Sequence, residues 1–293
     1  MLLERFIKAK TAEVEGLRRL AEQGKIPAPL DVPRPEFSAA LCGRSLPAVR
    51  LGEYSLAVVA EYKRASPSRG GICENIGIEE AVRQYAASGA GCLSILTEET
   101  YFHGDISYLH KAADPALYAK HQPPLLRKDF IFDPLQVAAT AATPASALLL
   151  IVRLTPDVRT LRSLREQAES LGMQAVVEVF DREDLDLARQ SGARIIQVNA
   201  RDLGSLVTDR KAPLDLIRAC PPQKDEIWIA ASGIDSGGHL LDSARAGFAA
   251  VLVGSALMAG GTPGLTLTRL LEQAQAAGDA ASCTAGEKKG HAY

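Results

Sequence analysis

The sequence predicts an α/β protein, a single (β/α)8 TIM barrel with an N-terminal helical extension. Eight strand-like runs recur along the 293 residues, and their starts lie about 20 to 36 residues apart, the spacing of βα units in a parallel sheet. Several runs are apolar throughout, as expected of strands buried on both faces. A closed barrel of roughly 250 residues suits this length. An open doubly wound sheet with fewer strands is the alternative fold.

Residues 1–50 form the predicted N-terminal extension. Its first part predicts an amphipathic helix, because apolar side chains between Leu2 and Leu20 recur with a period near 3.6 residues. Prolines then recur between Pro27 and Pro35, and their fixed φ angle and missing N–H group favour an extended connector.

Residues 51–278 form the predicted barrel domain. Helix signals separate its strands: Asp181 can cap one helix, Asp157 can open another that ends at Gly172, and Gly247 ends a third. Residues 279–293 are rich in Ala, Gly, Lys and Ser without an apolar stripe, and we expect them to be disordered. The eight predicted strands cover residues 56–63, 92–96, 124–128, 148–152, 175–179, 195–199, 227–231 and 250–254.

Composition limits the possible partners and the compartment. The 33 basic and 35 acidic residues give a net charge of −2, which argues against nucleic-acid binding because that function favours a basic excess. No apolar run reaches the roughly 18 residues of a membrane span, and no secretory signal is visible. The five cysteines form no C-x-x-C pair, so we expect reduced thiols, no metal site and a cytoplasmic protein.

An acid and a base stand together at the end of the first predicted strand. Glu61 and Lys63 are two residues apart, so both side chains project from the same face of the strand. A loop of Ser, Pro and Gly follows at once. Charged groups are costly at the end of a buried strand, and this pair therefore indicates a functional site.

Polar side chains stand at or beside the ends of four further predicted strands. Lys128 and Asn199 end their strands, Glu178 nearly ends its strand, and Ser232 follows its strand. Taken singly, each could be a solvated rim charge, a structural ion-pair partner or a turn residue. Together with the acid–base pair they all fall at the carboxyl ends of the strands, where barrel enzymes build their active sites.

Two glycine-containing loops suggest an anion site. Gly233 follows the seventh predicted strand, and Gly254 and Ser255 follow the eighth, just before a short helical segment. Exposed backbone N–H groups and a helix N-terminus favour a phosphate there. The alternative is that these glycines serve only to allow tight turns.

Eight motifs carry a resemblance to a known family. In order along residues 56–258 they are AEYKRASPSRG, LSILTEETYFHG, LLRKDFIFDPLQV, ALLLIV, VVEVFDREDL, VNARDL, ASGI and VLVGSALM. The sequence resembles indole-3-glycerol phosphate synthase. This resemblance implies a carboxy-lyase of tryptophan biosynthesis that converts 1-(2-carboxyphenylamino)-1-deoxyribulose 5-phosphate to indole-3-glycerol phosphate, CO2 and water, without metal or organic cofactor.

The resemblance also implies roles for the charged residues. Lys128 matches the general acid that donates a proton to the ketone during ring closure. Lys63 matches the lysine that contacts the substrate carboxylate, with a disputed share in proton transfer. Glu178 matches the acid–base group of the dehydration step, and Glu61 the carboxylate that orients the lysines.

The remaining predicted site residues surround the rest of the substrate. By the same resemblance, Asn199 and Ser232 lie around the ribulose chain and the ring, and Phe102 lies beside the anthranilate ring. Arg201 belongs to the same motif and stands among the substrate-binding candidates, where bracing Glu61 or Glu178 is favoured over direct contact with the substrate. The phosphate site corresponds to Ser66, Gly233, Gly254 and Ser255.

Some positions depart from the family pattern. Ala231 stands where a glutamate is usual, Pro144 where a flexible residue is usual, and Ala200 where asparagine or serine is common. Arg153 has no assigned role. None of these departures removes a proposed catalytic group.

Two other functions are weighed. Phosphoribosylanthranilate isomerase is similar in fold but requires a cysteine and an aspartate where this chain has Glu61, Lys63 and Asn199. A catalytically silent barrel acting as an assembly subunit is the alternative from another class. We expect a phosphorylated small molecule as partner, with no nucleic acid and no membrane, and a monomer, with a weak homo-oligomer as the alternative.

Overall fold

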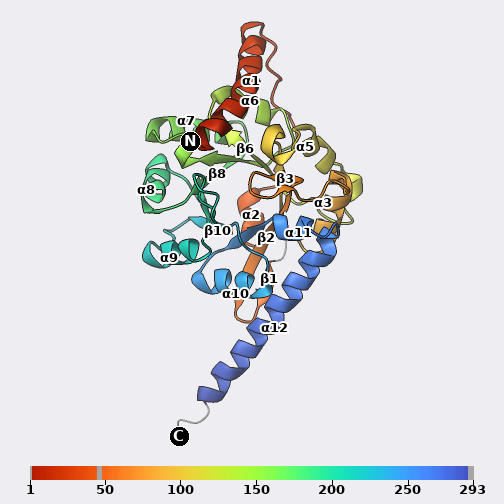
Figure 1. Cartoon of the computed structure of the whole chain (residues 1–293), viewed down its shortest axis with the longest axis vertical. Coiled ribbons are helices and arrows are strands. Elements are labelled where there is room, and N and C mark those ends of the chain that lie inside the picture. Colours follow the sequence, from red (N-terminus) through yellow and green to blue (C-terminus); the bar gives the residue numbers. More distant parts are fainter. Residues whose placement is uncertain (1, 45–47, 290–293) are drawn as a thin grey trace.

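A computed structural model describes the backbone of residues 2–44 and 48–289 (Figure 1). Side chains are described for residues 3–44 and 48–280. Within these residues, no helix is both long enough and apolar enough to cross a membrane.

Eight parallel strands close into a barrel. Neighbours in the chain pair in parallel, and β2 pairs with both β11 and β5, so the sheet has no open edge along these strands. The predicted TIM barrel is confirmed, and each predicted run overlaps one strand. The strands are β2 (Tyr54–Tyr62), β5 (Cys92–Leu96), β6 (Leu125–Ile131), β7 (Ala147–Ile151), β8 (Gln174–Val179), β9 (Ile195–Asn199), β10 (Ile227–Ala231) and β11 (Ala250–Val253).

Strand β6 is longer than the sequence predicts. Prediction ended it at Lys128, but the apolar residues Phe130 and Ile131 continue the strand. Its pairing with β7 is irregular between Arg127 and Ile131. Lys128 therefore lies inside this irregular stretch and not at the end of the strand.

Helices surround the barrel and begin at the predicted caps. The Asp181 carboxylate accepts the Asp184 N–H at 2.9 Å, and the Asp157 carboxylate accepts the Thr160 N–H at 2.9 Å. Gly247 ends its helix with a φ of +103°. The main helices are α3 (Ile78–Ala87), α6 (Pro134–Ala141), α7 (Val158–Ser170), α8 (Arg182–Ser191), α9 (Lys211–Ala219) and α10 (Gly237–Ala246), and shorter helices are α4 (Glu99–Phe102), α5 (Ser107–Ala112) and α11 (Ser255–Met258).

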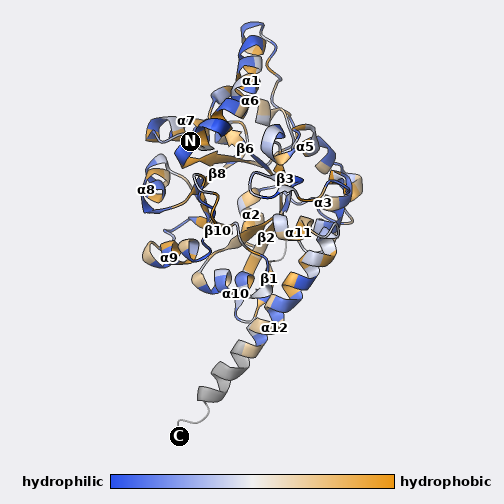
Figure 2. Ribbon diagram, in the orientation of Figure 1, coloured by the Kyte–Doolittle hydropathy of each residue, from blue (hydrophilic) through white to orange (hydrophobic). Residues whose placement is uncertain are grey.

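The apolar core has two parts, one inside the barrel and one between strands and helices. The strands are mostly apolar in colour, whereas the helices carry polar residues on their outer sides (Figure 2). The single tryptophan, Trp228, lies in the outer part near Phe248 and donates a hydrogen bond to Glu226. Alternate residues of each strand face the barrel interior, and this alternation determines which side chains can reach the site.

The N-terminal extension covers both ends of the barrel. Helix α1 (Leu2–Glu22) places Phe6 against Phe130 of β6, with ring centroids 4.2 Å apart. Helix α2 (Phe37–Leu41) is buried, and its apolar side chains join Ala57 and Cys92 near the amino ends of the strands. The predicted extended connector has no regular secondary structure over residues 26–36. A short strand, β1 (Val49–Leu51), pairs antiparallel with β2.

The C-terminal segment differs from the predicted disordered tail. Helix α12 (Pro263–Lys289) runs through most of it and extends away from the barrel (Figure 1). The segment is rich in alanine and also contains Glu and Lys, which favour a helix even without an apolar stripe. The last predicted tail residues, 290–293, lie outside the described residues.

Candidate active site

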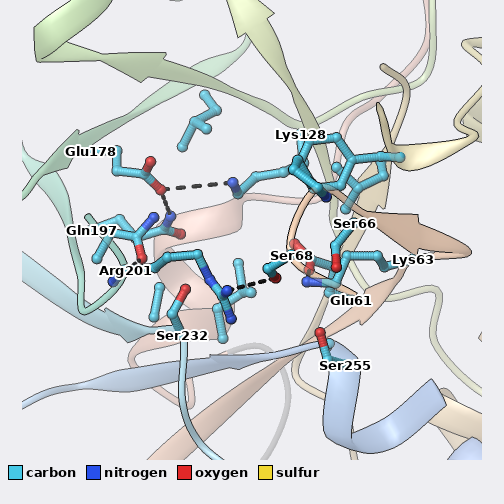
Figure 3. Close-up of a pocket in the computed structure, with 18 of the residues that line it drawn as sticks. Glu61, Lys63, Ser66, Ser68, Lys128, Glu178, Gln197, Arg201, Ser232 and Ser255 are labelled. Atoms are coloured by element: carbon cyan, nitrogen blue, oxygen red, sulfur yellow. Dashed lines mark hydrogen bonds and ion pairs between the residues drawn. The ribbon is translucent and has the colours of Figure 1, made fainter. Parts of the chain in front are cut away.

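A cavity of about 250 Å³ opens at the carboxyl ends of the barrel strands (Figure 3). The short hairpin of β3 (Ala65–Ser66) and β4 (Gly70–Gly71) borders it next to β2. Every residue that the sequence placed in the site lines this cavity. These residues are Glu61, Lys63, Ser66, Phe102, Lys128, Glu178, Asn199, Arg201, Ser232, Gly233, Gly254 and Ser255.

Glu61 and Lys63 form an ion pair at the end of β2. The Lys63 Nζ lies 2.8 Å from the Glu61 Oε1, and the Ser94 hydroxyl donates to the other carboxylate oxygen at 3.3 Å. Burial alone would raise the pKa of Glu61, but the ammonium groups of Lys63 and Lys128 and these hydrogen bonds bring it below its ordinary value. Glu61 is therefore ionised near neutral pH and holds Lys63.

Lys128 and Glu178 form a second ion pair across the barrel. They come from β6 and β8, and the Lys128 Nζ lies 3.7 Å from the Glu178 Oε2. The Glu178 side chain is only 1% exposed, whereas that of Lys128 is 18% exposed. Because Lys128 also influences Glu61, its ammonium group acts on both buried carboxylates. Two amines and two carboxylates thus share one cavity.

Gln197 is a cavity residue that the sequence reasoning missed. It precedes Asn199 by two residues on β9 and is fully buried. Its Nε2 donates a hydrogen bond to the Glu178 Oε2. A polar residue at an inward position of a buried strand is the signal that could have identified it.

Asn199 and Arg201 shape the loop after β9. The Asn199 Oδ1 accepts the backbone N–H of Arg201 at 3.0 Å, which is the turn-closing role weighed for it above. The Arg201 guanidinium donates to the Ser68 hydroxyl at 2.7 Å and so links this loop to the one after β2. Burial and the neighbouring Arg69 lower the pKa of Arg201, and Glu61 opposes this change.

The expected bracing of Glu61 or Glu178 by Arg201 stays a prediction. Among the described residues, no hydrogen bond or ion pair joins it to Glu61 or Glu178. The Arg201 Nη1 instead donates to the Ser68 hydroxyl and the Leu206 carbonyl, and Glu61 is near enough to influence the pKa of Arg201.

The loops after β10 and β11 have unusual backbones. Ser232 and Gly233 have φ angles of +71° and +73°, so this turn uses the left-handed region twice in succession. Gly254 lies against Glu61, and a Cβ there would clash with the Glu61 carboxylate. The buried Ser66 hydroxyl also lines the cavity and has no hydrogen-bond partner among the described residues.

Aromatic rings line the side of the cavity next to α1. Phe102 tilts toward Phe130 at a centroid distance of 6.1 Å, and Phe6 stacks on the same ring. Sequence reasoning placed Phe102 in the site but missed Phe6 and Phe130. Phe6 could not be assigned because its position depends on how α1 packs.

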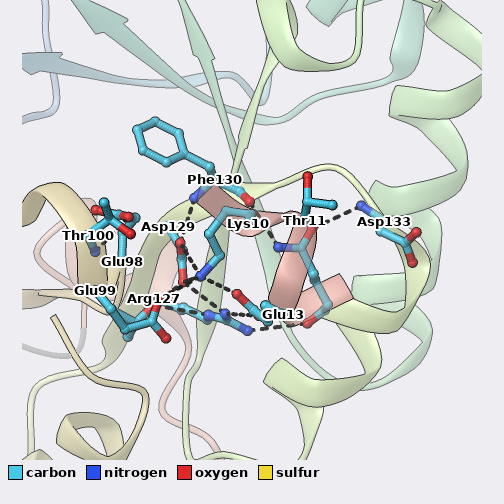
Figure 4. A network of polar contacts seen from close by, with 12 residues as sticks. Lys10, Thr11, Glu13, Glu98, Glu99, Thr100, Arg127, Asp129, Phe130 and Asp133 are labelled. Carbon is cyan, nitrogen blue, oxygen red and sulfur yellow. Dashed lines mark hydrogen bonds and ion pairs between the residues drawn. The ribbon is translucent and has the colours of Figure 1, made fainter. Parts of the chain in front are cut away.

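A buried ionic network joins α1 to the strand that carries Lys128 (Figure 4). The Lys10 Nζ lies 3.2 Å from the Asp129 carboxylate, and it also pairs with Glu13 and Glu99. The Arg127 guanidinium bonds Asp129 at 2.8 Å and Glu13 at 3.0 Å. Arg127 and Asp129 flank Lys128, so the network fixes the backbone on both sides of it.

Arg153, which had no assigned role, bonds three carboxylates. Its guanidinium pairs with Asp181, Asp184 and Asp202 at 2.6 to 3.2 Å and lies over the Phe180 ring. Arg153 is not among the cavity residues. It joins the loops after β8 and β9.

The residues with described side chains contain no cluster of three His, Cys, Asp or Glu arranged to hold a metal ion. The fold and the cavity together define the chain as an enzyme of the TIM-barrel class, with its charged groups at the carboxyl ends of the strands.

Sequence comparison identifies the family. The sequence model of indole-3-glycerol phosphate synthase matches residues 3–270. The chain is 37% identical over 264 residues to the indole-3-glycerol phosphate synthase of Roseiflexus castenholzii, covering 88% of this chain and 93% of that protein. It is 40% identical over 258 residues to the one of Mycolicibacterium vanbaalenii, covering 88% and 86%. The chain belongs to the indole-3-glycerol phosphate synthase family, which confirms the predicted family and enzyme class.

Solved structures support the fold alone. The 3-hexulose-6-phosphate synthase from Salmonella typhimurium superposes with a TM-score of 0.56 at 17% identity, covering 76% of this chain and all of that one. At such low identity the likeness concerns the barrel architecture and not the chemistry.

Proposed function

We propose that this chain converts 1-(2-carboxyphenylamino)-1-deoxyribulose 5-phosphate to indole-3-glycerol phosphate, CO2 and water. The observation that carries the proposal is the meeting of two lysine–glutamate pairs in one cavity of a chain of this family. Family membership gives the reaction, and the two pairs supply the groups that its proton transfers need.

The charges of the cavity suit such a substrate. One carboxylate and one phosphate bring about three negative charges near neutral pH. The ammonium groups of Lys63 and Lys128 offset part of this charge. The phosphate would bind at the loops of Gly233 and Gly254, where the unpartnered Ser66 hydroxyl can donate to it.

Ring closure requires a proton at the ketone oxygen. As the ring carbon that bears the carboxylate attacks the ketone carbon, Lys128 donates that proton and the ketone becomes a hydroxyl. Loss of CO2 then leaves its electron pair in the ring. Loss of CO2 has already restored the benzene ring, so the hydroxyl departs as water with a proton supplied by an acid, and loss of a proton from the methylene carbon beside the nitrogen makes the five-membered ring aromatic. Glu178 performs acid–base work in this dehydration.

The two carboxylates have different surroundings. Glu61 is held ionised by Lys63 and Lys128, which suits a group that fixes amines in place. Glu178 faces the Lys128 ammonium at 3.7 Å, within reach of a proton exchanged after a small movement. General acid–base catalysis contributes roughly 10²- to 10⁴-fold, so orientation and electrostatic stabilisation supply the rest.

The aromatic side of the cavity would hold the anthranilate ring. Phe102 and Phe130 present their rings at that side, next to Phe6 of α1. Apolar contact there leaves the carboxylate of the ring free to meet Lys63.

The activity is tested by incubating the purified chain with the ribulose phosphate substrate. We expect CO2 and indole-3-glycerol phosphate in equal amounts, identified by mass spectrometry. Conversion of phosphoribosylanthranilate instead would support the isomerase alternative. A folded chain that turns over neither compound would support the silent assembly subunit.

We also propose that the protein acts in the cytoplasm as a monomer. The four cysteines with described side chains are all free thiols, which suits a reducing compartment. All the residues expected in the site meet in one cavity within one copy of the chain, which supports a monomer. Light scattering coupled to size exclusion would measure the mass, and a dimer would contradict this part.

A further inference from the structure

Gln197 has one hydrogen-bonded end and one unpartnered end. Its Nε2 donates to the Glu178 Oε2, whereas its Oε1 is buried and meets no hydrogen-bond donor among the described residues. The residue is fully buried and lines the cavity (Figure 3). Buried amide oxygens normally have a partner, so this one calls for an explanation.

The register of the strands fixes which end of the amide faces which neighbour. Gln197 on β9 is paired with Glu178 on β8, so their inward side chains are adjacent. An ionised carboxylate only accepts hydrogen bonds, so the amide nitrogen must face it. The amide oxygen is consequently directed away from Glu178.

The other side of Gln197 offers no donor side chain. Its register partner on β10 is Ile229, and the next inward residue on that strand is Ala231. Both side chains are apolar, and Ala231 presents only a methyl group to the cavity. No described side chain donates to this oxygen, so a molecule in the cavity can supply the donor.

The chemistry of the amide oxygen selects the group that it binds. An amide oxygen accepts and does not donate, so it would not recognise the phosphate or the carboxylate of the substrate, which are acceptors. The substrate's carbon chain would cross the cavity between the lysines and the loops of Gly233 and Gly254. That chain carries hydroxyl groups, which are donors.

We infer that Gln197 is a substrate-binding residue whose side-chain oxygen accepts a hydrogen bond from a hydroxyl of the ribulose-derived chain. The inference rests on the proposed function. Glu178 has a part in it, because its carboxylate holds the amide in the orientation that aims the oxygen at the substrate. Gln197 thereby adds a contact that distinguishes a hydroxylated chain from a deoxygenated one.

The test compares two ligands that differ in the hydroxyls. Indole-3-glycerol phosphate carries two hydroxyls on its chain, and indole-3-propanol phosphate carries none. Titration calorimetry measures both dissociation constants for the unmodified protein and for Gln197→Met, which keeps an unbranched side chain but has no amide. Gln174→Met is the matched control, because Gln174 begins β8 and bonds Ser38 outside the cavity.

We expect Gln197→Met to bind indole-3-glycerol phosphate roughly three- to tenfold more weakly, the effect of one lost hydrogen bond. Its affinity for indole-3-propanol phosphate should stay within twofold, which also shows that the cavity is intact. Gln174→Met should keep both affinities. The double comparison isolates the contact between the amide and the hydroxyls.

Other outcomes would overturn the inference. Equal losses for the two ligands would assign Gln197 a structural role only, and an unchanged preference would show that it does not contact the hydroxyls. If Gln197→Met does not fold, Gln197→Asn withdraws the oxygen by one methylene and should show the same loss of preference. Failure of the unmodified protein to bind either ligand would count against the proposed function itself.

Discussion

Single residues decide how charge is arranged in the cavity. Lys128 acts on two buried carboxylates, Glu61 and Glu178, and a third carboxylate, Asp129, follows it directly in the chain. Asp129 also borders the cavity, but its carboxylate is paired with Lys10 and Arg127 in the α1 network. Neighbouring residues of one strand therefore have different partners, Lys128 in the cavity and Asp129 in the network.

Replacement of Lys128 by alanine tests the general acid. We expect kcat of Lys128→Ala to fall by about 10²- to 10⁴-fold, because proton delivery to the ketone is lost. Substrate affinity should change much less, since Lys63 and the anion loops remain. Steady-state kinetics with a separately measured dissociation constant would check this. Lys120→Ala, at an exposed lysine outside the cavity, is the control. Weakened binding with kcat intact would refute the assignment.

Gly254 tests how closely the loop after β11 must approach Glu61. An added Cβ would clash with the Glu61 carboxylate, which would move away from Lys63. We expect Gly254→Ala to lose about 10²-fold in kcat/KM, a typical effect of displacing catalytic groups by about 1 Å. Gly238→Ala is the control, because the Cβ there would come no closer than 3.8 Å to a neighbouring atom. Full activity in Gly254→Ala would show that the loop can move without cost.

Asp129 gives a prediction of pH dependence. Burial would raise the pKa of Asp129, but Arg127 and Lys10 together with hydrogen bonds hold it below its ordinary value of 3.8. The folded state therefore binds fewer protons than the unfolded state. The contribution of Asp129 to stability is complete above about pH 4 and is lost as the pH falls through its lowered folded pKa.

Replacement of Asp129 by asparagine should show this pH-dependent contribution to stability directly. We expect Asp129→Asn to be less stable than the unmodified protein at pH 7, because Lys10 and Arg127 lose a buried counter-charge. The difference in the free energy of unfolding between Asp129→Asn and the unmodified protein should become smaller below pH 4. Urea titrations at pH 7, 5 and 3.5 would measure it, and a constant difference across this range would contradict the linkage.

The sequence predicted that several polar residues would meet in one cavity. Glu61 and Lys63 share a face by strand periodicity, and Glu178 and Asn199 stand at or beside the ends of strands that were identified correctly. Gln197 was missed because it lies one inward position deeper, where apolar filling is usual. Phe6 was missed because the amphipathic pattern indicates the apolar face of α1 but not which part of the barrel that face meets.

Contacts between secondary-structure elements also support the site. Helix α1 is bound to β6 by the Lys10 network and by Phe6 stacked on Phe130. The amphipathic pattern predicted the helix itself. It could not predict the docking, because Lys10 looks like a solvent-facing charge in the sequence and is 1% exposed in the structure.

Replacement of Lys10 by methionine tests the docking of α1. The Lys10→Met variant leaves Asp129 and Glu13 with Arg127 as their remaining partner. Removing one member of a buried ion pair costs about 3–5 kcal/mol, and we expect the lower end because Arg127 remains. Urea unfolding would measure the loss. Lys8→Met, at an exposed position of the same helix, should change stability by less than about 0.5 kcal/mol. Equal stabilities would mean that α1 contributes little through Lys10.

At the scale of the whole molecule, helix α12 follows the last strand and packs back on the barrel wall. Leu267 and Ala274 of α12 are fully buried, and the helix contacts α3 and α10. Because α3 follows β2 and α10 precedes β11, α12 covers the seam where the first and last barrel strands pair. The closed sheet was predicted from the count of eight runs, but this seam cover was not, since its apolar pattern is weak.

Because α12 covers this seam, two leucines of the helix should differ in how much they contribute to stability. We expect Leu267→Ala to lower the free energy of unfolding by about 2–5 kcal/mol, because the side chain is fully buried. Leu265→Ala, where the side chain is 50% exposed, should cost less than about 0.5 kcal/mol. Circular dichroism during urea unfolding would compare them. Similar values for the two variants would show that α12 does not hold the seam.

The position of Trp228 has a practical consequence. It is the only indole of the chain, and it lies on the helix side of β10, outside the cavity. Its fluorescence should report whether the barrel is folded, and should change little when a ligand fills the cavity. Any indole signal that grows with time in a reaction mixture would then arise from newly made product, so one optical trace could follow catalysis against a steady protein background.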